Sequence, residues 1–166
     1  MKTALHPPQR AMHLLDIEYL VGGPAKAEGA DVQGLVTQFR STAEWHGNDL
    51  MIGAASHWCY QRLAFDMPSD VRFLPAGGGP DAADLQLLGE IDPVWVAERA
   101  DRVVVGSGDH IFEDLIIDLR NEGVEVWAVG HRHNMARRLQ MVADEVRFLP
   151  FDPDPAVCLD SQVEAA

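Results

Sequence analysis

The chain is poor in lysine and in positive charge as a whole. Its 166 residues include 13 lysines and arginines against 26 aspartates and glutamates, which gives a formal net charge of −13, and only Lys2 and Lys26 are lysines. A protein that wraps duplex nucleic acid usually presents a broad basic face, because neutralising phosphates supplies most of its affinity. The charge balance excludes such a face, so any contact with nucleic acid must be local or carried by bound cations.

Cysteines and long hydrophobic runs are also scarce. The two cysteines, Cys59 and Cys158, lie far apart and lack the spacing of a metal or redox motif, so we expect free thiols. No run approaches the roughly 18 apolar residues that a membrane-spanning helix needs, and the N-terminus lacks the charged-then-apolar pattern of a secretion signal. We therefore expect a cytoplasmic protein without membrane contact.

The length and composition are those of one ordinary globular domain. Hydrophobic residues make up 47% of the chain and charged residues 23%, and 166 residues suffice to bury a sizeable core. We expect a single domain over residues 11–150, with loose termini at 1–10 and 151–166. The four tryptophans and six methionines favour a homodimer.

Strand-like and helix-like segments alternate along the whole chain. Apolar or β-branched runs of strand length occur at residues 12–17, 50–54, 71–74, 103–105, 124–129 and 146–149. Helical spacing of apolar residues is found at 31–44, 58–65, 80–91, around 95–96, at 112–119 and at 136–142. This alternation predicts an α/β fold, namely a doubly wound, mostly parallel sheet of five to six strands with helices on both faces.

The run of three valines at 103–105 predicts a buried central strand. It breaks at Gly106-Ser107-Gly108, and a helical pattern begins soon after Asp109. In open α/β sheets, ligands bind in the crevice outside the carboxyl ends of the strands. Asp109 is therefore expected either to project its carboxylate into that crevice or to cap the following helix, and the residues alone leave both open.

Two further aspartates occupy comparable positions. Asp16 ends the first predicted strand, and Asp84 lies with Asp81 in the first turn of a helix that Pro80 is expected to open. If these strands are neighbours, Asp16, Asp84 and Asp109 meet in one crevice. Clustered carboxylates repel one another unless a hard cation is present, so the pattern predicts bound Mg²⁺ or Mn²⁺. The alternative is that one acid caps a helix, one forms a salt bridge and one is solvated.

The order of these motifs resembles the NYN domain family, a branch of the PIN-like ribonucleases. The central match is Ser107-Gly108-Asp109 after a strand, and it is extended by 123–126, Ala143-Asp144 and 146–149. Residues 14–18 resemble the family's opening strand, and residues 81–87 resemble its next acidic segment. The resemblance covers about residues 11–150. It implies a PIN-like fold and a metal-dependent endoribonuclease in which Asp16, Asp84 and Asp109 are catalytic and hold Mg²⁺ or Mn²⁺.

The sequence departs from the family pattern at several polar positions. Tyr19 stands where the family usually has Asn, and Ile111 stands where its central motif has a second Asp. A lysine that often precedes the acid matched to Asp84 is absent. These departures leave a second interpretation open, in which the chain is a catalytically degenerate module that binds RNA or a protein partner without cutting.

Four neighbouring residues are candidate auxiliary groups: Glu18, Asp81, Ser107 and His110. Glu18 lies on the same side as Asp16 if the first strand continues to it. His110 could serve as an acid or a base beside Asp109, or be an exposed neighbour. Ser107 could donate a hydrogen bond into the crevice or only shape the turn.

A small basic cluster follows the fifth predicted strand. Its candidate contacts to the phosphates of an RNA strand are Arg132, Asn134, Arg137 and Arg138. The alternative is a solvated start of a helix. A phospho-receiver domain also carries acids at strand ends, but it needs a lysine near the end of the fifth strand, and residues 126–133 contain none.

Overall fold

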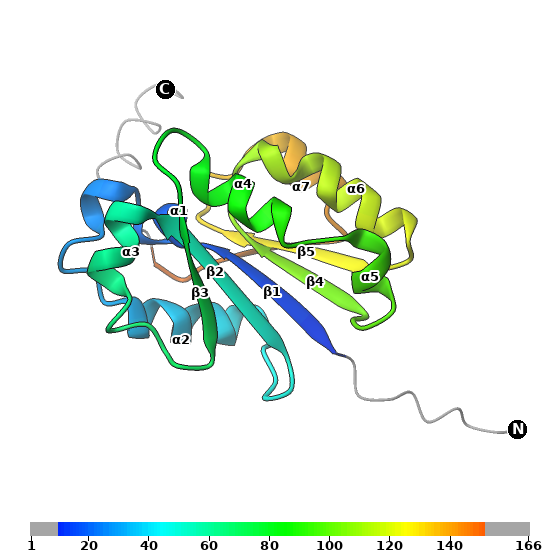
Figure 1. Cartoon of the computed structure of the whole chain (residues 1–166). Coiled ribbons are helices and arrows are strands. Elements are labelled where there is room, and N and C mark those ends of the chain that lie inside the picture. The colour runs from blue at the N-terminus through cyan, green and yellow to red at the C-terminus, as the bar shows by residue number, and fades with distance from the viewer. Residues whose placement is uncertain (1–9, 152–166) are drawn as a thin grey trace, which may run out of the picture.

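The computed structural model describes residues 10–151, which form one six-stranded sheet with helices packed on both faces (Figure 1). The strands are β1 (Ala11–Asp16), β2 (Leu50–Ser56), β3 (Val71–Ala76), β4 (Arg102–Gly106), β5 (Glu125–Gly130) and β6 (Glu145–Phe148). The helices are α1 (Ile17–Val21), α2 (Val32–Thr42), α3 (His57–Leu63), α4 (Ala82–Gly89), α5 (Pro93–Ala97), α6 (Glu113–Asn121) and α7 (Arg137–Val142), with 3-10 turns η1 (Pro24–Lys26) and η2 (His110–Phe112).

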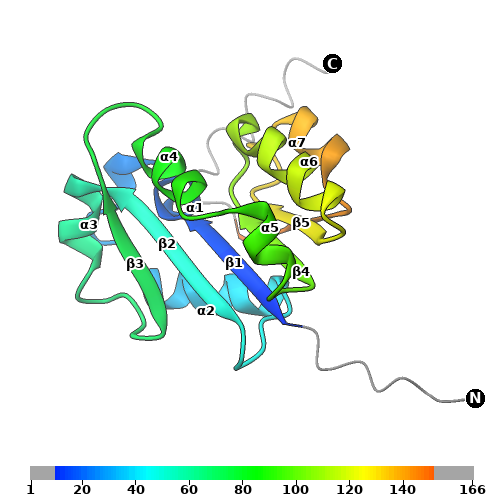
Figure 2. The ribbon, with the colours of Figure 1, turned by 45° about the vertical axis from the view of Figure 1, so that its right-hand side comes forward.

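Every neighbouring pair of strands is parallel, and the order is β3-β2-β1-β4-β5-β6. The predicted doubly wound α/β fold is thereby confirmed. Successive residues of a strand face opposite sides of the sheet. Accordingly Leu14 and Val105 pack with α4 to α7 on one face, and Leu15 and Val104 pack with α1 to α3 on the other. Figures 1 and 2 show α2 below the sheet and α4, α6 and α7 above it.

The carboxyl ends of β1 and β4 mark the point where the winding of the sheet reverses. From β1 the chain proceeds outward to β2 and β3, and it then returns to β4 on the other side of β1. Leu15 pairs with Gly106, and a Cβ at Gly106 would lie only 2.7 Å from an atom of the Phe39 ring. Because β1 and β4 are paired up to Leu15 and Gly106, the residues that follow the two strands lie side by side, at the position where open α/β sheets bind ligands.

Most predicted elements begin and end within one or two residues of the observed bounds, but the segment after β1 was predicted wrongly. The strand does not continue past Asp16, because residues Ile17–Val21 form the short helix α1. Asp16 caps this helix, since its Oδ1 accepts the N–H of Tyr19 at 3.2 Å. Gly22, at φ 95°, ends the helix in the left-handed conformation that glycine adopts most readily.

The start of α4 also differs from the prediction. Pro80 does not open the helix, which begins at Ala82, and Asp81 precedes it as the N-cap residue. Asp81 has a φ of 58°, a left-handed conformation that aspartate tolerates better than most residues. Asp84 remains in the first turn, as predicted.

The two ends of the described chain contact the domain. The N–H of Arg10 donates to Asp101 at 3.1 Å, and the Phe151 ring lies 5.8 Å from the His131 ring between centroids. The rest of the predicted loose termini, and Cys158, lie outside the described residues. Within residues 10–151, Cys59 is a buried free thiol, and no helix has the length and apolar character to cross a membrane. The cytoplasmic location and the domain bounds 11–150 stay predictions.

Candidate metal centre

Asp16 ends β1, Asp109 follows the adjacent strand β4, and the hydroxyl group of Ser107 connects them. The Ser107 Oγ donates to Asp16 Oδ2 at 3.2 Å and accepts the N–H of Asp109 at 3.2 Å. Ser107 is completely buried and Asp16 is only 6% exposed. The Ser107 hydroxyl therefore lies between the two acids, and its auxiliary role stays a prediction.

Helix α4 brings two more carboxylates to the same place. Asp81, Asp84 and Asp109 each offer an oxygen, and these three oxygens lie within 4.8 Å of one another. Asp84 is 6% exposed, and its Oδ1 is buried without a hydrogen-bond partner among the described residues. A buried carboxylate oxygen without a donor is costly unless a cation or proton binds it. The oxygen donor set is the one that Mg²⁺ and Mn²⁺ prefer, so these residues fit such an ion.

The crowding of the acids changes their protonation. Burial raises the pKa of Asp84 to about 8, and the charges of Asp16, Asp109 and Asp81 add to the effect. Burial also raises the pKa of Asp16, against hydrogen bonds from Tyr19, Asp84 and Ser107. Without a cation, Asp84 therefore keeps its proton near neutral pH.

Asp109 fulfils both of the roles that the sequence left open. Its Oδ1 accepts the N–H of Ile111 at 3.0 Å and so caps η2, while its carboxylate joins the acidic group. His110 lies beside it, with Nδ1 3.2 Å from the same Oδ1 and a side chain that is 69% exposed. An exposed imidazole at this point can reach a bound molecule.

Glu18 does not lie where the sequence placed it. The prediction assumed a continuing strand, whereas α1 turns Glu18 toward β2, where its Oε1 accepts the N–H of Ser56 at 2.6 Å. It is not among the carboxylates that gather at Asp84. Glu18 ties α1 to the end of β2, and its predicted position on the strand beside Asp16 was wrong.

A cleft leads from Asp109 toward the predicted basic cluster. Its volume is about 360 Å³, and its lining runs from Gly108–His110 to His133–Ala136, so it includes Asn134. Arg137 follows directly at the start of α7 and is exposed, and Arg138 lies 3.8 Å from Glu113. The Arg132 guanidinium stacks 4.4 Å from the centre of the Phe148 ring. No described carboxylate lies within 4.0 Å of Arg132 or Arg137, which leaves their charges available to a ligand.

Tyr19 contributes to this region in a way that sequence reasoning missed. Its hydroxyl accepts the N–H of His131 at 2.8 Å, and its ring packs against Gly108 and Gly130. In the sequence Tyr19 was only a departure from a motif. The glycines just after β4 and at the end of β5 are the one local signal that a bulky side chain lies against both strand ends.

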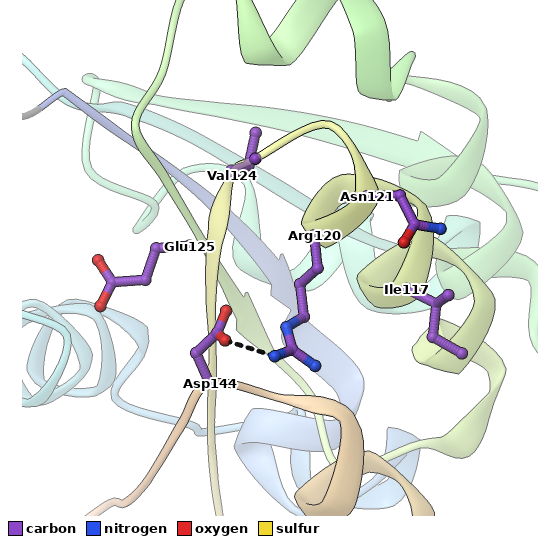
Figure 3. A pocket seen from close by; sticks show the side chains of 7 residues that line it. Ile117, Arg120, Asn121, Val124, Glu125 and Asp144 are labelled. Carbon is purple, nitrogen blue, oxygen red and sulfur yellow. Dashed lines mark ion pairs between the residues drawn. The ribbon is translucent and has the colours of Figure 1, made fainter.

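A larger cavity lies at the opposite edge of the sheet (Figure 3). It measures about 620 Å³ and is lined by the end of α6, the start of β5 and Asp144. Figure 3 shows Arg120 reaching from α6 to Asp144, with an N–O distance of 2.9 Å. Because the guanidinium already neutralises this carboxylate, the cavity does not share the chemistry of the acidic group.

The tryptophans do not gather into one surface. Trp127 is buried, whereas Trp58 and Trp95 are 41% and 45% exposed on the separate helices α3 and α5. Each of the exposed rings is covered on one face by an arginine of its own chain. The homodimer therefore stays a prediction.

More than half of the chain matches a known protein family. Residues 62–151 match the NYN domain. The chain belongs to the NYN domain family. NYN domains form a PIN-like ribonuclease family, as the order of motifs predicted. The matched range includes Asp81, Asp84 and Asp109, whereas β1 with Asp16 precedes it.

Solved structures agree on the fold of this NYN protein. The crystal structure of a protein of unknown function from Vibrio parahaemolyticus is similar, with a TM-score of 0.59 and 18% sequence identity over 87% of this chain and 94% of that chain. At this identity the likeness establishes the fold alone. No curated protein matches the sequence.

Proposed function

We propose that this NYN protein is a divalent-metal-dependent endoribonuclease that hydrolyses RNA phosphodiesters. The observation that carries the proposal is the gathering of oxygens of Asp81, Asp84 and Asp109 within 4.8 Å of one another, with the charge of Asp16 near enough to raise the pKa of Asp84, where the winding of the sheet reverses. Family membership supports an RNA-related, nuclease-like activity. The cation, the substrate and the cleavage itself are the proposed parts.

Asp16, Asp84 and Asp109 are the proposed ligands of Mg²⁺ or Mn²⁺, with Asp81 as a fourth acid at the rim. When bound, such an ion lowers the pKa of water and stabilises the charge that develops on a phosphoryl group. Asp84 gives up its proton when a cation replaces it, because ligating carboxylates must be ionised. Ser107 holds Asp16 and Asp109 in register with each other.

The RNA strand is proposed to run from the acidic group into the cleft beside Asp109. His110 and Asn134 border this path, and Arg132 and Arg137 offer guanidinium groups that fit phosphate oxygens. Arg138 contributes less, because Glu113 already lies 3.8 Å from it. A local basic cluster of this kind suits a single strand, in a chain whose net charge of −13 disfavours a wrapped duplex.

Calorimetric titration with Mn²⁺ and with Mg²⁺, paired with cleavage of an end-labelled single-stranded RNA, tests the proposal. We expect saturable binding and cleavage in the wild type, and loss of both in Asp109→Asn with an unchanged circular dichroism spectrum. Asp118→Asn, which makes the same change at an exposed position of α6, is the matched control and should behave as wild type. Full cleavage by Asp109→Asn would refute the assignment.

One observation favours the degenerate module as the second candidate. Ile111 packs partly buried against the core, so that position contributes no carboxylate to the centre. If this alternative holds, the wild type retains RNA at low salt and leaves it uncut with either ion. The same titration separates the two functions.

A further inference from the structure

Tyr19 connects the two halves of the candidate metal centre. Its backbone N–H donates to Asp16 Oδ1 at 3.2 Å, and its side-chain hydroxyl accepts the N–H of His131 at 2.8 Å. His131 is 1% exposed, and its ring Nε2 in turn lies 3.1 Å from the carbonyl oxygen of Leu20. One residue of α1 thus holds an acid at the end of β1 and the segment that follows β5.

The surroundings of the Tyr19 ring leave no room for a second side chain. A Cβ at Gly108 would lie 2.5 Å from the Tyr19 hydroxyl and 2.2 Å from the carbonyl oxygen of Asn134, and a Cβ at Gly130 would also lie 2.5 Å from that hydroxyl. Contacts this short do not occur for real Cβ atoms. A side chain at either glycine would therefore collide with Tyr19, and one at Gly108 would also collide with the backbone of Asn134.

The same contacts reach Asp109. Gly108 directly precedes Asp109, and its carbonyl oxygen accepts the N–H of Ala136 at 2.8 Å. The turn 106–109 is thereby clamped between Tyr19 on α1 and the segment 131–136. The residue before Asp109 is therefore in close contact with Tyr19, whose own N–H donates to Asp16.

We propose that Tyr19 is a positioning residue of the metal centre, whose hydroxyl and ring set Asp109 relative to Asp16 by locking the turns after β4 and β5 together. The inference rests on the proposed function, which it deepens. It also gives Tyr19 a role in place of the asparagine of the family pattern. An asparagine at this position is too short to reach the His131 N–H and would leave it unsatisfied in a buried place.

Tyr19→Phe removes only the hydroxyl and is the central test. We expect kcat for RNA cleavage to fall by at least about tenfold, KM to change by less than about twofold, and Mn²⁺ to bind more weakly. Metal ligands that are poorly positioned slow the chemical step more than they weaken substrate binding. Tyr19→Asn should lose more than Tyr19→Phe. Tyr60→Phe, which alters the only other tyrosine, on α3 against Phe73, is the matched control. A lower Tm with wild-type kcat and Mn²⁺ affinity in Tyr19→Phe would overturn the proposal.

Amide hydrogen exchange judges the positioning without any need for activity. In Tyr19→Phe the amides of Asp109 and Ile111 should exchange faster together with that of His131, whereas faster exchange at His131 alone would refute the coupling. Because hydrogen exchange needs no activity, it tests the positioning role of Tyr19 separately from the ribonuclease. A wild type that neither binds metal nor cleaves RNA refutes only the ribonuclease.

Gly130→Ala supplies a reciprocal test, because its methyl group displaces the Tyr19 hydroxyl. Combined with Tyr19→Phe, its loss of kcat should be smaller than the product of the two single losses, since the phenylalanine removes the shortest contact of the methyl group and leaves only those at 3.0 Å to the ring and to Met135. Independent, fully multiplicative losses would contradict the shared contact.

Discussion

The carboxylates have different neighbours at the amino ends of the strands, called the amino edge below, and at their carboxyl ends, called the carboxyl edge. At the amino ends of the strands, arginines neutralise the acids in the pairs Arg72–Glu90, Arg102–Glu125, Arg120–Asp144 and Arg147–Glu44, with N–O distances of 2.8 to 3.0 Å. At the carboxyl ends, Asp16, Asp81, Asp84 and Asp109 crowd one another, and within residues 10–151 no arginine or lysine lies within 4.0 Å of any of them.

A buried pair at the amino edge makes the contrast clearest. Asp49 accepts hydrogen bonds from His13 Nε2 at 3.0 Å, from the N–H of Ala11 at 3.0 Å and from the N–H of His46 at 2.8 Å. These donors lower the pKa of Asp49, although burial opposes them. The buried carboxylate of Asp84, by contrast, is surrounded by other acids. Hydrogen bonds and ion pairs account for the carboxylates at the amino edge, whereas the acids at the carboxyl edge fit the cation proposed above.

Replacing one carboxylate oxygen by an amide nitrogen should change stability in opposite directions at the two edges. The largest effect on activity is expected at the carboxyl edge. Asp84→Asn is expected to lower RNA cleavage by more than about 10³-fold and to abolish Mn²⁺ binding, while raising the Tm of the metal-free protein by about 3 °C or more, because it removes a crowded acid. Asp144→Asn should lower the Tm, since it removes the negative charge that pairs with Arg120 and leaves that guanidinium only its hydrogen bond to the carbonyl oxygen of Val142. Cleavage assays and thermal melts with a chelator measure both. A lower Tm in Asp84→Asn would contradict the contrast between the edges.

Removing Asp49 should affect stability alone. Asp49→Ala leaves His13 and two backbone N–H groups without an acceptor, and we expect it to lower the free energy of unfolding by about 2–4 kcal/mol. Under conditions where the variant is folded, kcat should equal that of the wild type. Urea unfolding followed by circular dichroism gives the first quantity and single-strand cleavage the second. A loss of kcat in the folded variant would show that the two edges are coupled.

The pH dependence of stability should have opposite signs at the two edges. The raised pKa of Asp84 means that the folded chain holds this proton more tightly than the unfolded chain, so this group's contribution to stability falls as pH rises from about 4 to about 8. Burial lowers the pKa of His13, so its contribution falls as pH drops below about 6.5.

Thermal melts of metal-free wild type and Asp84→Asn between pH 5 and pH 9 isolate the first effect. The advantage in Tm of Asp84→Asn should grow with pH, and saturating Mn²⁺ should remove it by stabilising only the wild type. A constant difference across this range would mean that Asp84 is ionised throughout.

The smallest expected effect concerns RNA binding. Arg137→Ala, in the Asp109→Asn background to prevent cleavage, should weaken binding of a single-stranded RNA by about three- to tenfold and reduce the salt dependence by about one phosphate contact. Arg99→Ala at the amino edge removes the same charge, but Arg99 is paired with Glu98, so its effect should be negligible. Fluorescence anisotropy across a range of salt concentrations measures both. Equal losses in the two variants would point to a diffuse charge effect.

Part of the acidic group could be predicted directly, because Asp16 ends β1 and Asp109 follows the adjacent strand β4, whereas α4 carries Asp84 to them although β2 separates β3 from β1. Asp16, Asp84 and Asp109 were expected together, since parallel strands bring their carboxyl ends to one edge. The helix α1 could not be predicted, because the segment Ile17–Val21 has the β-branched and aromatic composition of a strand. It is helical through contacts distant in sequence, such as that of Glu18 with Ser56, and the contact of Tyr19 with His131 is equally invisible in the sequence.

The first of the described strands, β1, lies in the middle of the sheet, and this bears on how the domain is synthesised. On the ribosome, β1 must wait for β4 before both of its edges are paired, and Tyr19 meets its partner His131 only 112 residues later. The nascent chain therefore gains the four acids one after another, and the candidate metal centre is assembled only when nearly the whole domain has been translated. If the proposed cleavage of RNA holds, the domain therefore acquires it only once its own translation is almost complete.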